Sequence, residues 1–180
     1  MDEAPLCQNA RPFSLTYDNR NRLSLAAGTS YNCNGRGERV FKTGTLFSYD
    51  EGGHLLGEYT TAGGLGAEYL YTDSIPVAYI AGGTLYYVEA DELGTPRQVI
   101  QPGATTANDT TEWKWDYFAS NSAFGENAPS VQTITFNLRF PSQYFDAETG
   151  LNYNYFRDYE PGTGRYVESD PVGLRGGVST

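Results

Sequence analysis

The chain has 180 residues, including 15 Tyr, 9 Phe, 21 Gly and 9 Pro, and its formal net charge at pH 7 is −10. This acidity argues against nucleic acid or an anionic membrane as a partner, because both require a basic surface, and no run of about 20 apolar residues is present to insert into a bilayer. Aromatic residues punctuated by Gly and Pro favour short strands and tight turns, and no segment keeps an apolar period of 3.6 residues, so we expect an all-β fold.

The first residues and the cysteines bear on cellular location. Residues 1–5 (Met-Asp-Glu-Ala-Pro) lack the basic start and the apolar run of a secretory signal. We therefore expect the chain to be cytoplasmic before any export, with other machinery carrying it out. Cys7 and Cys33 are the only cysteines, and two cysteines in a chain of this length do not make a disulfide framework. We expect both to be free thiols.

Two Tyr-Asp units predict hairpins in the first half of the chain. The pattern Tyr-Asp-x-x-x-(Arg/His)-Leu occurs at 17–23 and again at 49–55. Tyr closes the incoming strand, and Asp can accept hydrogen bonds from backbone amides two or three residues further on. The fifth position favours Gly or Asn, which tolerate a left-handed backbone, and Leu begins the outgoing strand.

Further turn signals alternate with short apolar pieces. Asn34-Gly35 is a strong hairpin-turn signal, and Gly82-Gly83 separates the two strands of another candidate hairpin. Residues 92–97 are expected to form a turn that leads into a strand. The strand pieces predicted in this part of the chain are Val40-Phe41, Leu46-Phe47, 69–71, 77–80, 85–88 and 98–100.

A polar stretch then precedes an aromatic strand. Residues 101–112 contain few core candidates and are expected to form the longest loop. The next strand, 113–118, places Trp113, Trp115 and Tyr117 on one face, because side chains alternate along a strand. These rings either pack between strands or line a sugar-binding groove, since sugar faces stack on Trp and Tyr.

The last third of the chain contains two copies of one turn motif. Asp146-Ala-Glu-Thr-Gly150 and Glu160-Pro-Gly-Thr-Gly164 each combine an acidic residue, a short turn closed by Thr-Gly and a following strand that carries an aromatic residue. The two closing glycines are 14 residues apart, which is close to the repeat of a small β-hairpin. We expect two consecutive hairpins here.

These segments together resemble the Rhs proteins, the bacterial YD-repeat family. The Tyr-Asp units match its repeat, residues 83–97 match a characteristic segment of its core, and Asp170-Pro-Val-Gly-Leu174 matches the Asp-Pro-x-Gly-Leu signature at the end of the core. The chain departs from the family where Glu89 or Glu92 stands in place of a usual His. Residues 1–16 and 101–111 match nothing in the pattern, and the chain looks truncated after the signature.

The resemblance implies an architecture and a role. YD repeats wind into a β-sheet shell that encloses a toxin used in bacterial competition, so we expect consecutive antiparallel hairpins that form a curved, open sheet. We expect YD-type hairpins at 1–100, the polar loop at 101–112 and a core-type region at 113–180. The expected partners are the rest of the shell or a toxin domain, with secretion-system proteins or a glycan also compatible with the family. The expected location after export is secreted or on the cell surface.

The resemblance also implies an aspartyl autoprotease in the core. Arg157, Asp158 and Asp170 match the residues that the family uses. Repulsion between two close carboxyls splits their pKa values, so one acts as a base and the other holds a proton, while a nearby Arg orients a carboxylate or stabilises an oxyanion. Only six residues follow Leu174 in this sequence, so we expect the scissile segment to be absent and the protease to be inactive or incomplete.

Strand register raises an objection to the Asp158–Asp170 pair. If the turn at 161–164 is a hairpin loop, Glu160 faces Arg165 and Asp158 faces Val167. Asp170 then lies three positions further along, roughly 10 Å from Asp158 at ~3.3 Å per residue. The pair forms only if the chain bends near Pro171. Otherwise Asp158 pairs with a nearby Arg and Asp170 caps a turn.

No other pattern predicts a catalytic or cofactor site. His54 is the only histidine and lies beside a Gly-Gly turn, and no phosphate-binding glycine loop is present. We expect no cofactor and no metal. Three hypotheses remain: a shell component, a latent aspartyl peptidase and a carbohydrate-binding module. An isolated open sheet would also be expected to expose its inner aromatic face.

Overall fold

The computed structural model describes residues 12–119 and 122–171, which are nearly all β structure. Twelve strands form one sheet and four form a second. The elements of the large sheet are β1 Leu15–Tyr17, β2 Leu23–Ala26, β3 Thr29–Cys33, β4 Arg39–Lys42, β5 Thr45–Tyr49, β6 Leu55–Thr60, β7 Leu65–Thr72, β8 Ile75–Ala81, β9 Thr84–Ala90, β10 Pro96–Gln101, β11 Thr110–Lys114 and β12 Val131–Gln132. The small sheet contains β13 Tyr144–Asp146, β14 Leu151–Asn154, β15 Arg157–Glu160 and β16 Arg165–Tyr166, and a 3-10 helix, η1, covers Thr106–Asn108.

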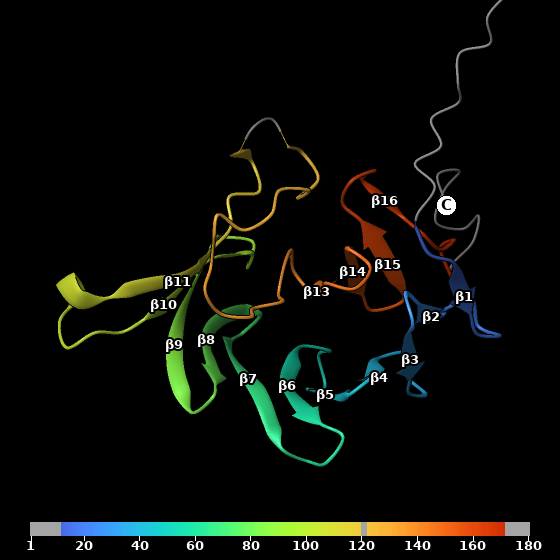
Figure 1. Cartoon of the computed structure of the whole chain (residues 1–180), viewed down its shortest axis with the longest axis horizontal. Coiled ribbons are helices and arrows are strands. Elements are labelled where there is room, and N and C mark those ends of the chain that lie inside the picture. Colours follow the sequence, from blue (N-terminus) through green and yellow to red (C-terminus); the bar gives the residue numbers. More distant parts are fainter. Residues whose placement is uncertain (1–11, 120–121, 172–180) are drawn as a thin grey trace, which may run out of the picture.

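Each sheet is a succession of hairpins. Strand order follows chain order in both sheets, from β1 to β12 and from β13 to β16, and the recorded strand pairs are all antiparallel. The large sheet follows a curved path from β1 to β11, and the small sheet lies inside the curve (Figure 1). β1 and β12 lie at opposite ends of the strand order, so the sheet is open. The predicted all-β fold of consecutive antiparallel hairpins is confirmed.

The Tyr-Asp units form hairpin turns as predicted. Asp18 Oδ1 accepts hydrogen bonds from the amides of Arg20 and Arg22, at 2.8 and 3.0 Å. These amides are two and four residues further on, instead of the expected two or three. The fifth position of each unit is left-handed, with φ of 59° at Asn21 and 85° at Gly53. Only such a residue lets the chain reverse here at low cost.

Three further turns have the same construction without a Tyr-Asp pair. They begin at Asn34, Thr60 and Asp91, whose side-chain oxygens accept a hydrogen bond from the amide four residues later. The residue three positions after each is a glycine with φ of 98°, 83° and 86° respectively. Asn34-Gly35 therefore marks a turn, as expected, but the left-handed residue is Gly37. A search for Asp, Asn or Thr followed three residues later by Gly would have found all three turns.

The glycine turns predicted later in the chain are also present. Gly82 and Gly83 join β8 to β9, both with positive φ (57° and 79°), as a two-residue turn of this kind requires. Gly150 and Gly164 close the two Thr-Gly turns with φ of 72° and 66°. The β15–β16 turn pairs Glu160 with Arg165, which confirms the predicted register.

The main core lies between the large sheet and the segment that follows it. Phe136, Leu138, Tyr144 and Tyr153 pack on the inner aromatic face of the large sheet, and Leu151 packs on β2 and β3. The expectation that this inner face would be exposed is therefore wrong. The sequence did not reveal that the last third of the chain folds back over the first part and buries that face.

The strand predicted at 113–118 is only partly present, since β11 begins at Thr110 and ends at Lys114, but the predicted alternation of buried and exposed side chains holds. Trp113, Trp115 and Tyr117 are buried, whereas Lys114 and Asp116 between them are exposed. β11 and β12 belong to the large sheet, and the small sheet begins at Tyr144. The predicted loop at 101–112 is shorter in the structure, because Gln101 ends β10 and Thr110 begins β11. The division of the chain into regions at 100 and 112 stays a prediction.

Candidate active site

A buried ion pair joins the two sheets. Arg39 on β4 makes two hydrogen bonds to the carboxylate of Asp146 on β13, and Lys42 Nζ lies 3.1 Å from the same carboxylate. Asp146 is fully buried and Arg39 is 2% exposed. Since a buried charge is tolerated only when it is paired and hydrogen-bonded, this contact holds β13 in one position against β4.

Aromatic rings complete the surroundings of Arg39. Its guanidinium carbon lies 4.2 Å from the ring centroid of Tyr153, within the range of a cation–π contact. The Arg39 amide also donates a 2.8 Å hydrogen bond to the Tyr153 hydroxyl. Tyr153 pairs with Asp158 across β14 and β15. The Arg39 cluster therefore positions the strand that carries Asp158.

Asp158 forms a buried carboxyl pair with Glu168. Asp158 is 4% exposed and Glu168 is 6% exposed. The Asp158 amide donates a 2.7 Å hydrogen bond to Glu168 Oε2, which brings the two carboxyl groups close together. Two carboxyls in contact inside a protein cannot both ionise without a large cost, so the pair retains a proton.

The burial of this pair raises the pKa values of both acids. Burial raises the pKa of Asp158 well above its usual range, and the adjacent Glu168 carboxyl raises it further, while Arg39 acts in the opposite sense. Burial also raises the pKa of Glu168, although its hydrogen bonds with Asp158 partly offset the effect. An acid that holds its proton beside a potential base is the arrangement that acid–base catalysis requires.

Arg157 and Asp170 form a separate contact. Arg157 Nη1 lies 3.4 Å from Asp170 Oδ2, and its guanidinium carbon lies 3.7 Å from the centroid of the Tyr166 ring. The structure thus pairs Asp170 with Arg157, and the carboxyl that contacts Asp158 is Glu168. The catalytic assignment of Asp158, Asp170 and Arg157 stays a prediction.

Glu168 was not among the residues proposed from the sequence. The hairpin register places it opposite Arg157, one position away from the partner of Asp158. β16 ends at Tyr166, so beyond that residue strand alternation no longer dictates where a side chain points. The Glu168 carboxylate can then turn toward the Asp158 amide, which a register argument could not predict.

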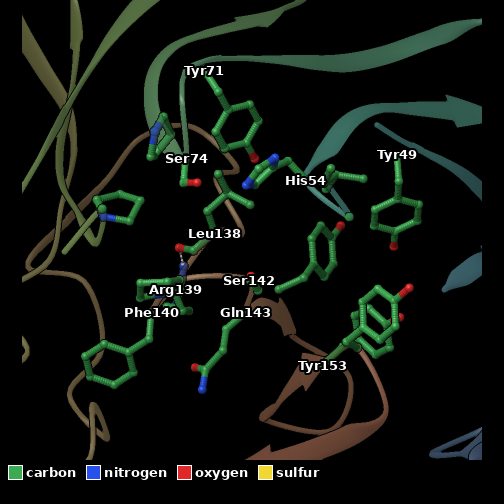
Figure 2. Close-up of a pocket in the computed structure, with 18 of the residues that line it drawn as sticks. Tyr49, His54, Tyr71, Ser74, Leu138, Arg139, Phe140, Ser142, Gln143 and Tyr153 are labelled. Atoms are coloured by element: carbon green, nitrogen blue, oxygen red, sulfur yellow. Dashed lines mark hydrogen bonds between the residues drawn. The ribbon is translucent and has the colours of Figure 1, made fainter. Parts of the chain in front are cut away.

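A cavity lies between the turns of the large sheet and the segment at 138–143. Its volume is about 290 Å³, and Tyr49, His54 and Tyr71 face that segment across it (Figure 2). His54 Nδ1 lies 2.8 Å from Asp50 Oδ2. Within the described ranges, no group of three or more His, Cys, Asp or Glu side chains could hold a metal ion.

Arg139 also lines this cavity and is buried. Its Nη1 donates to the carbonyl oxygens of Phe136 and Leu138, and the guanidinium lies over the rings of Trp113, Trp115 and Phe145. Burial lowers the pKa of Arg139 to about 10. These contacts account for Arg139 as part of the core.

The remaining sequence predictions concern the aromatic strand, the cysteines and membrane insertion. Trp113 is fully buried and Trp115 is 1% exposed, so these two rings pack in the core and offer no surface to a sugar. Cys33 is a free thiol, as predicted, whereas Cys7 and residues 172–174 of the signature lie outside the described residues. No helix in residues 12–119 or 122–171 is long and apolar enough to cross a membrane.

The open sheet of consecutive hairpins defines the class of protein as an all-β fold of sequential antiparallel hairpins. The fold matches the crystal structure of TcdB2-TccC3 without its hypervariable C-terminal region, with a TM-score of 0.58 and 14% identity over 90% of this chain and 9% of that one. No family model matches the chain.

Curated relatives agree with this fold. The chain is 34% identical over 96 residues to double-stranded DNA deaminase toxin A of Burkholderia cenocepacia (strain H111), a match that covers 53% of this chain. It is 32% identical over 93 residues to the probable deoxyribonuclease RhsA of Dickeya dadantii (strain 3937), which covers 52% of this chain. Each match spans 6% of the relative's length. In sequence, over about half of its length, and in fold, the chain is therefore similar to proteins of the Rhs/YD-repeat family.

Proposed function

We propose that this chain forms part of the wall of a toxin-enclosing Rhs shell, and that the carboxyl cluster of its last hairpin is an aspartyl autoprotease centre. The observation that carries the proposal is the buried Asp158–Glu168 pair on a segment that lines the concave side of a curved twelve-stranded sheet. Asp158 is the central residue, and Arg157 and Asp170 lie beside it on the same hairpin.

The architecture supports the shell role. An open sheet of sequential hairpins can extend at either end of its strand order, because the backbone groups on the outer edge of each terminal strand can pair with another strand. The Arg39–Asp146 ion pair keeps the last third of the chain on the concave side. The partners of this role are the rest of the shell and an enclosed toxin domain, and the location is secreted or at a cell surface after export.

The burial of the carboxyls supports the autoprotease role. Leaving two acids in contact inside a protein lowers stability, and strongly perturbed acids of this kind occur more often at functional sites than elsewhere. A centre whose main carboxyl is 4% exposed is poorly placed to act on a diffusing protein. Such a buried centre is better placed to cleave a segment of its own polypeptide that is held against it. We expect this segment on the C-terminal side of the Asp-Pro-Val-Gly-Leu element.

The test supplies such a segment. The full chain is extended beyond Thr180 with the downstream segment of an Rhs relative, and the products are measured by intact mass. We expect two fragments from the extended chain and a single uncut product from its Asp158→Asn variant. Asp116→Asn, which changes an exposed carboxyl, should leave cleavage unchanged.

Two results would contradict this proposal in different ways. Cleavage that continues in Asp158→Asn removes Asp158 from the centre. An uncut product from every extended variant removes the protease role and leaves the chain as a structural part of the shell.

A further inference from the structure

The cavity beside the segment at 138–143 is separate from the carboxyl pair of the last hairpin, because the residues that line it include neither Asp158 nor Glu168. Most of its walls are aromatic, proline and leucine side chains, among them Tyr71, Phe140 and Pro96. Ligand cavities in proteins have volumes of about 300–1,000 Å³ and apolar walls with a few polar groups. At about 290 Å³, this cavity has the size and the lining of a site for a small ligand.

Arg139, which lines the cavity, is a buried cation without a recorded acidic partner. It is 4% exposed, and the ion pairs recorded among the described residues do not include it. Arg39 is buried to a similar degree, but it makes two hydrogen bonds to the carboxylate of Asp146. Since a buried charge is tolerated only when it is paired, Arg139 marks a place for an anion that residues 12–119 and 122–171 do not supply.

One edge of the Arg139 guanidinium is unused. Its recorded hydrogen bonds run from Nη1 to the carbonyl oxygens of Phe136 and Leu138, at 3.1 and 2.9 Å, so Nε and Nη2 have no recorded partner in the described part of the chain. Neither atom is among the fully enclosed polar atoms that lack a partner, so both border open space. Nε–H and Nη2–H lie on the same side of a guanidinium, and together they can donate two parallel hydrogen bonds to one carboxylate.

The charge of Arg139 is not balanced by its neighbours. Burial lowers the pKa of Arg139 to about 10, so the group is still protonated at pH 7, and the groups that act in the opposite sense are Tyr69 and Tyr144. Burial raises the pKa of both tyrosines, so their hydroxyls are neutral at this pH. The positive charge therefore remains available to a ligand.

His54 supplies a second polar group on the opposite wall. It faces the segment at 138–143 across the cavity (Figure 2), and its Nδ1 lies 2.8 Å from Asp50 Oδ2. A carboxylate only accepts hydrogen bonds, so Nδ1 donates, and Nε2 of the neutral ring is an acceptor. A ligand that spans the cavity can therefore meet a cation on one wall and a hydrogen-bond acceptor on the other.

We propose that this cavity binds a small ligand in which a carboxylate is attached to an aromatic or other apolar body. The carboxylate pairs with the Nε–Nη2 edge of Arg139, and the apolar body packs on the tyrosine and proline walls. Aromatic walls alone would also suit a cation, but the guanidinium repels one. A free organic acid and the C-terminal end of a peptide share this chemistry, and the site does not depend on the autoprotease function.

The charge of the ligand is tested on the full chain with 3-phenylpropionate and its neutral counterpart 3-phenylpropanamide, by NMR of the nitrogen-15-labelled protein. We expect the acid to cause saturable shifts of the Arg139 Nε–H signal and of the amides at 138–143. The acid should bind at least about tenfold more tightly than the amide, as expected for one charge-assisted hydrogen-bonded pair. Equal affinities, or no saturable shift with the acid, overturn the proposal.

The role of Arg139 is tested by substitution. Arg139→Met keeps a long side chain beside Trp113 and Trp115 but removes the charge, so the affinity for the acid should fall by about tenfold or more, whereas that for the amide should not change. The matched control Arg97→Met changes an exposed arginine paired with Asp116 and should bind the acid as the wild type does. Unchanged binding of the acid by Arg139→Met overturns the assignment. If this variant does not fold, the comparison of acid and amide on the wild-type chain decides.

The source of the carboxylate is distinguished by N-acetylphenylalanine, which imitates the end of a peptide and carries an amide N–H that can donate to His54 Nε2. Tighter binding than that of 3-phenylpropionate supports the site and assigns it to a peptide terminus, and weaker binding supports it and assigns it to a free acid. A crystal structure with the tighter ligand should show its carboxylate within hydrogen-bonding distance of Arg139 Nε and Nη2. A carboxylate bound away from this edge overturns the proposed site.

Discussion

At the residue scale, the buried acid Asp158 makes stability depend on pH. Its pKa in the folded chain is raised by burial and by Glu168, above the value of about 3.9 that Asp has in an unfolded chain. Between these two values the folded state binds more protons than the unfolded state, so its stability is highest at low pH and falls as pH rises through this range.

We therefore predict that Asp158→Asn stabilises the chain at pH 7 and weakens this pH dependence. The gain should be about 1.4 kcal/mol for each unit by which the pKa of Asp158 is raised. Urea unfolding between pH 4 and pH 8 measures it. Asp73→Asn, at an exposed turn position, should follow the wild-type curve. A variant that is less stable than wild type at pH 7 would show that Asp158 is held ionised by favourable contacts.

At the element scale, the hairpins depend on single left-handed residues. Gly94 has φ of 86°, and a Cβ added there would lie 3.3 Å from the Ser74 carbonyl oxygen. We predict that Gly94→Ala lowers the free energy of unfolding by about 1–2 kcal/mol, the cost of a left-handed backbone for a residue with a Cβ. Equilibrium urea denaturation measures the change.

Gly35, in the similar turn that begins at Asn34, provides the matched control. A Cβ added at Gly35 meets nothing within 4 Å, and its φ lies outside the left-handed range. Gly35→Ala should therefore change stability by no more than about 0.5 kcal/mol. Equal effects at the two positions would mean that backbone handedness does not limit these turns.

At the scale of the whole molecule, the two sheets are joined by the ion pair between Arg39 and Asp146. We predict that Asp146→Asn lowers the free energy of unfolding by about 3–5 kcal/mol, because it leaves the buried Arg39 charge without its main partner. The small sheet should then separate from the large one and expose the aromatic core, which binding of a hydrophobic dye detects. Asp116→Asn, in an exposed pair with Arg97, should cost less than about 1 kcal/mol. A similar small loss for Asp146→Asn would show that apolar packing alone holds the sheets together.

Most local structure could be predicted from short sequence patterns. The Tyr-Asp units, Gly82-Gly83 and the two Thr-Gly turns are all hairpin turns in the structure, because a turn depends on the φ preference of one or two residues and on amides a few positions away. The alternation of Trp113, Trp115 and Tyr117 also predicted their common buried face. The turns at Asn34, Thr60 and Asp91 have the same construction, and the sequence pattern missed them because it required a Tyr-Asp pair.

The candidate site could be predicted only in part. Sequence resemblance named Arg157, Asp158 and Asp170, whose catalytic role stays a prediction, and the predicted register between Glu160 and Arg165 was correct. It did not identify Glu168, whose side chain lies beyond the last paired residue of β16.

The sequence by itself determined the all-β class, the hairpin turns and the resemblance to the Rhs/YD-repeat family, since these follow from local backbone preferences and from short motifs. Only the tertiary structure decided that residues 134–153 cover the inner aromatic face, that Arg39 reaches Asp146 across 107 positions, and that Asp158 meets Glu168. Such contacts depend on how the sheet curves and on which buried charges must find partners. These conditions are set by the packing of the whole chain and not by neighbours in the sequence.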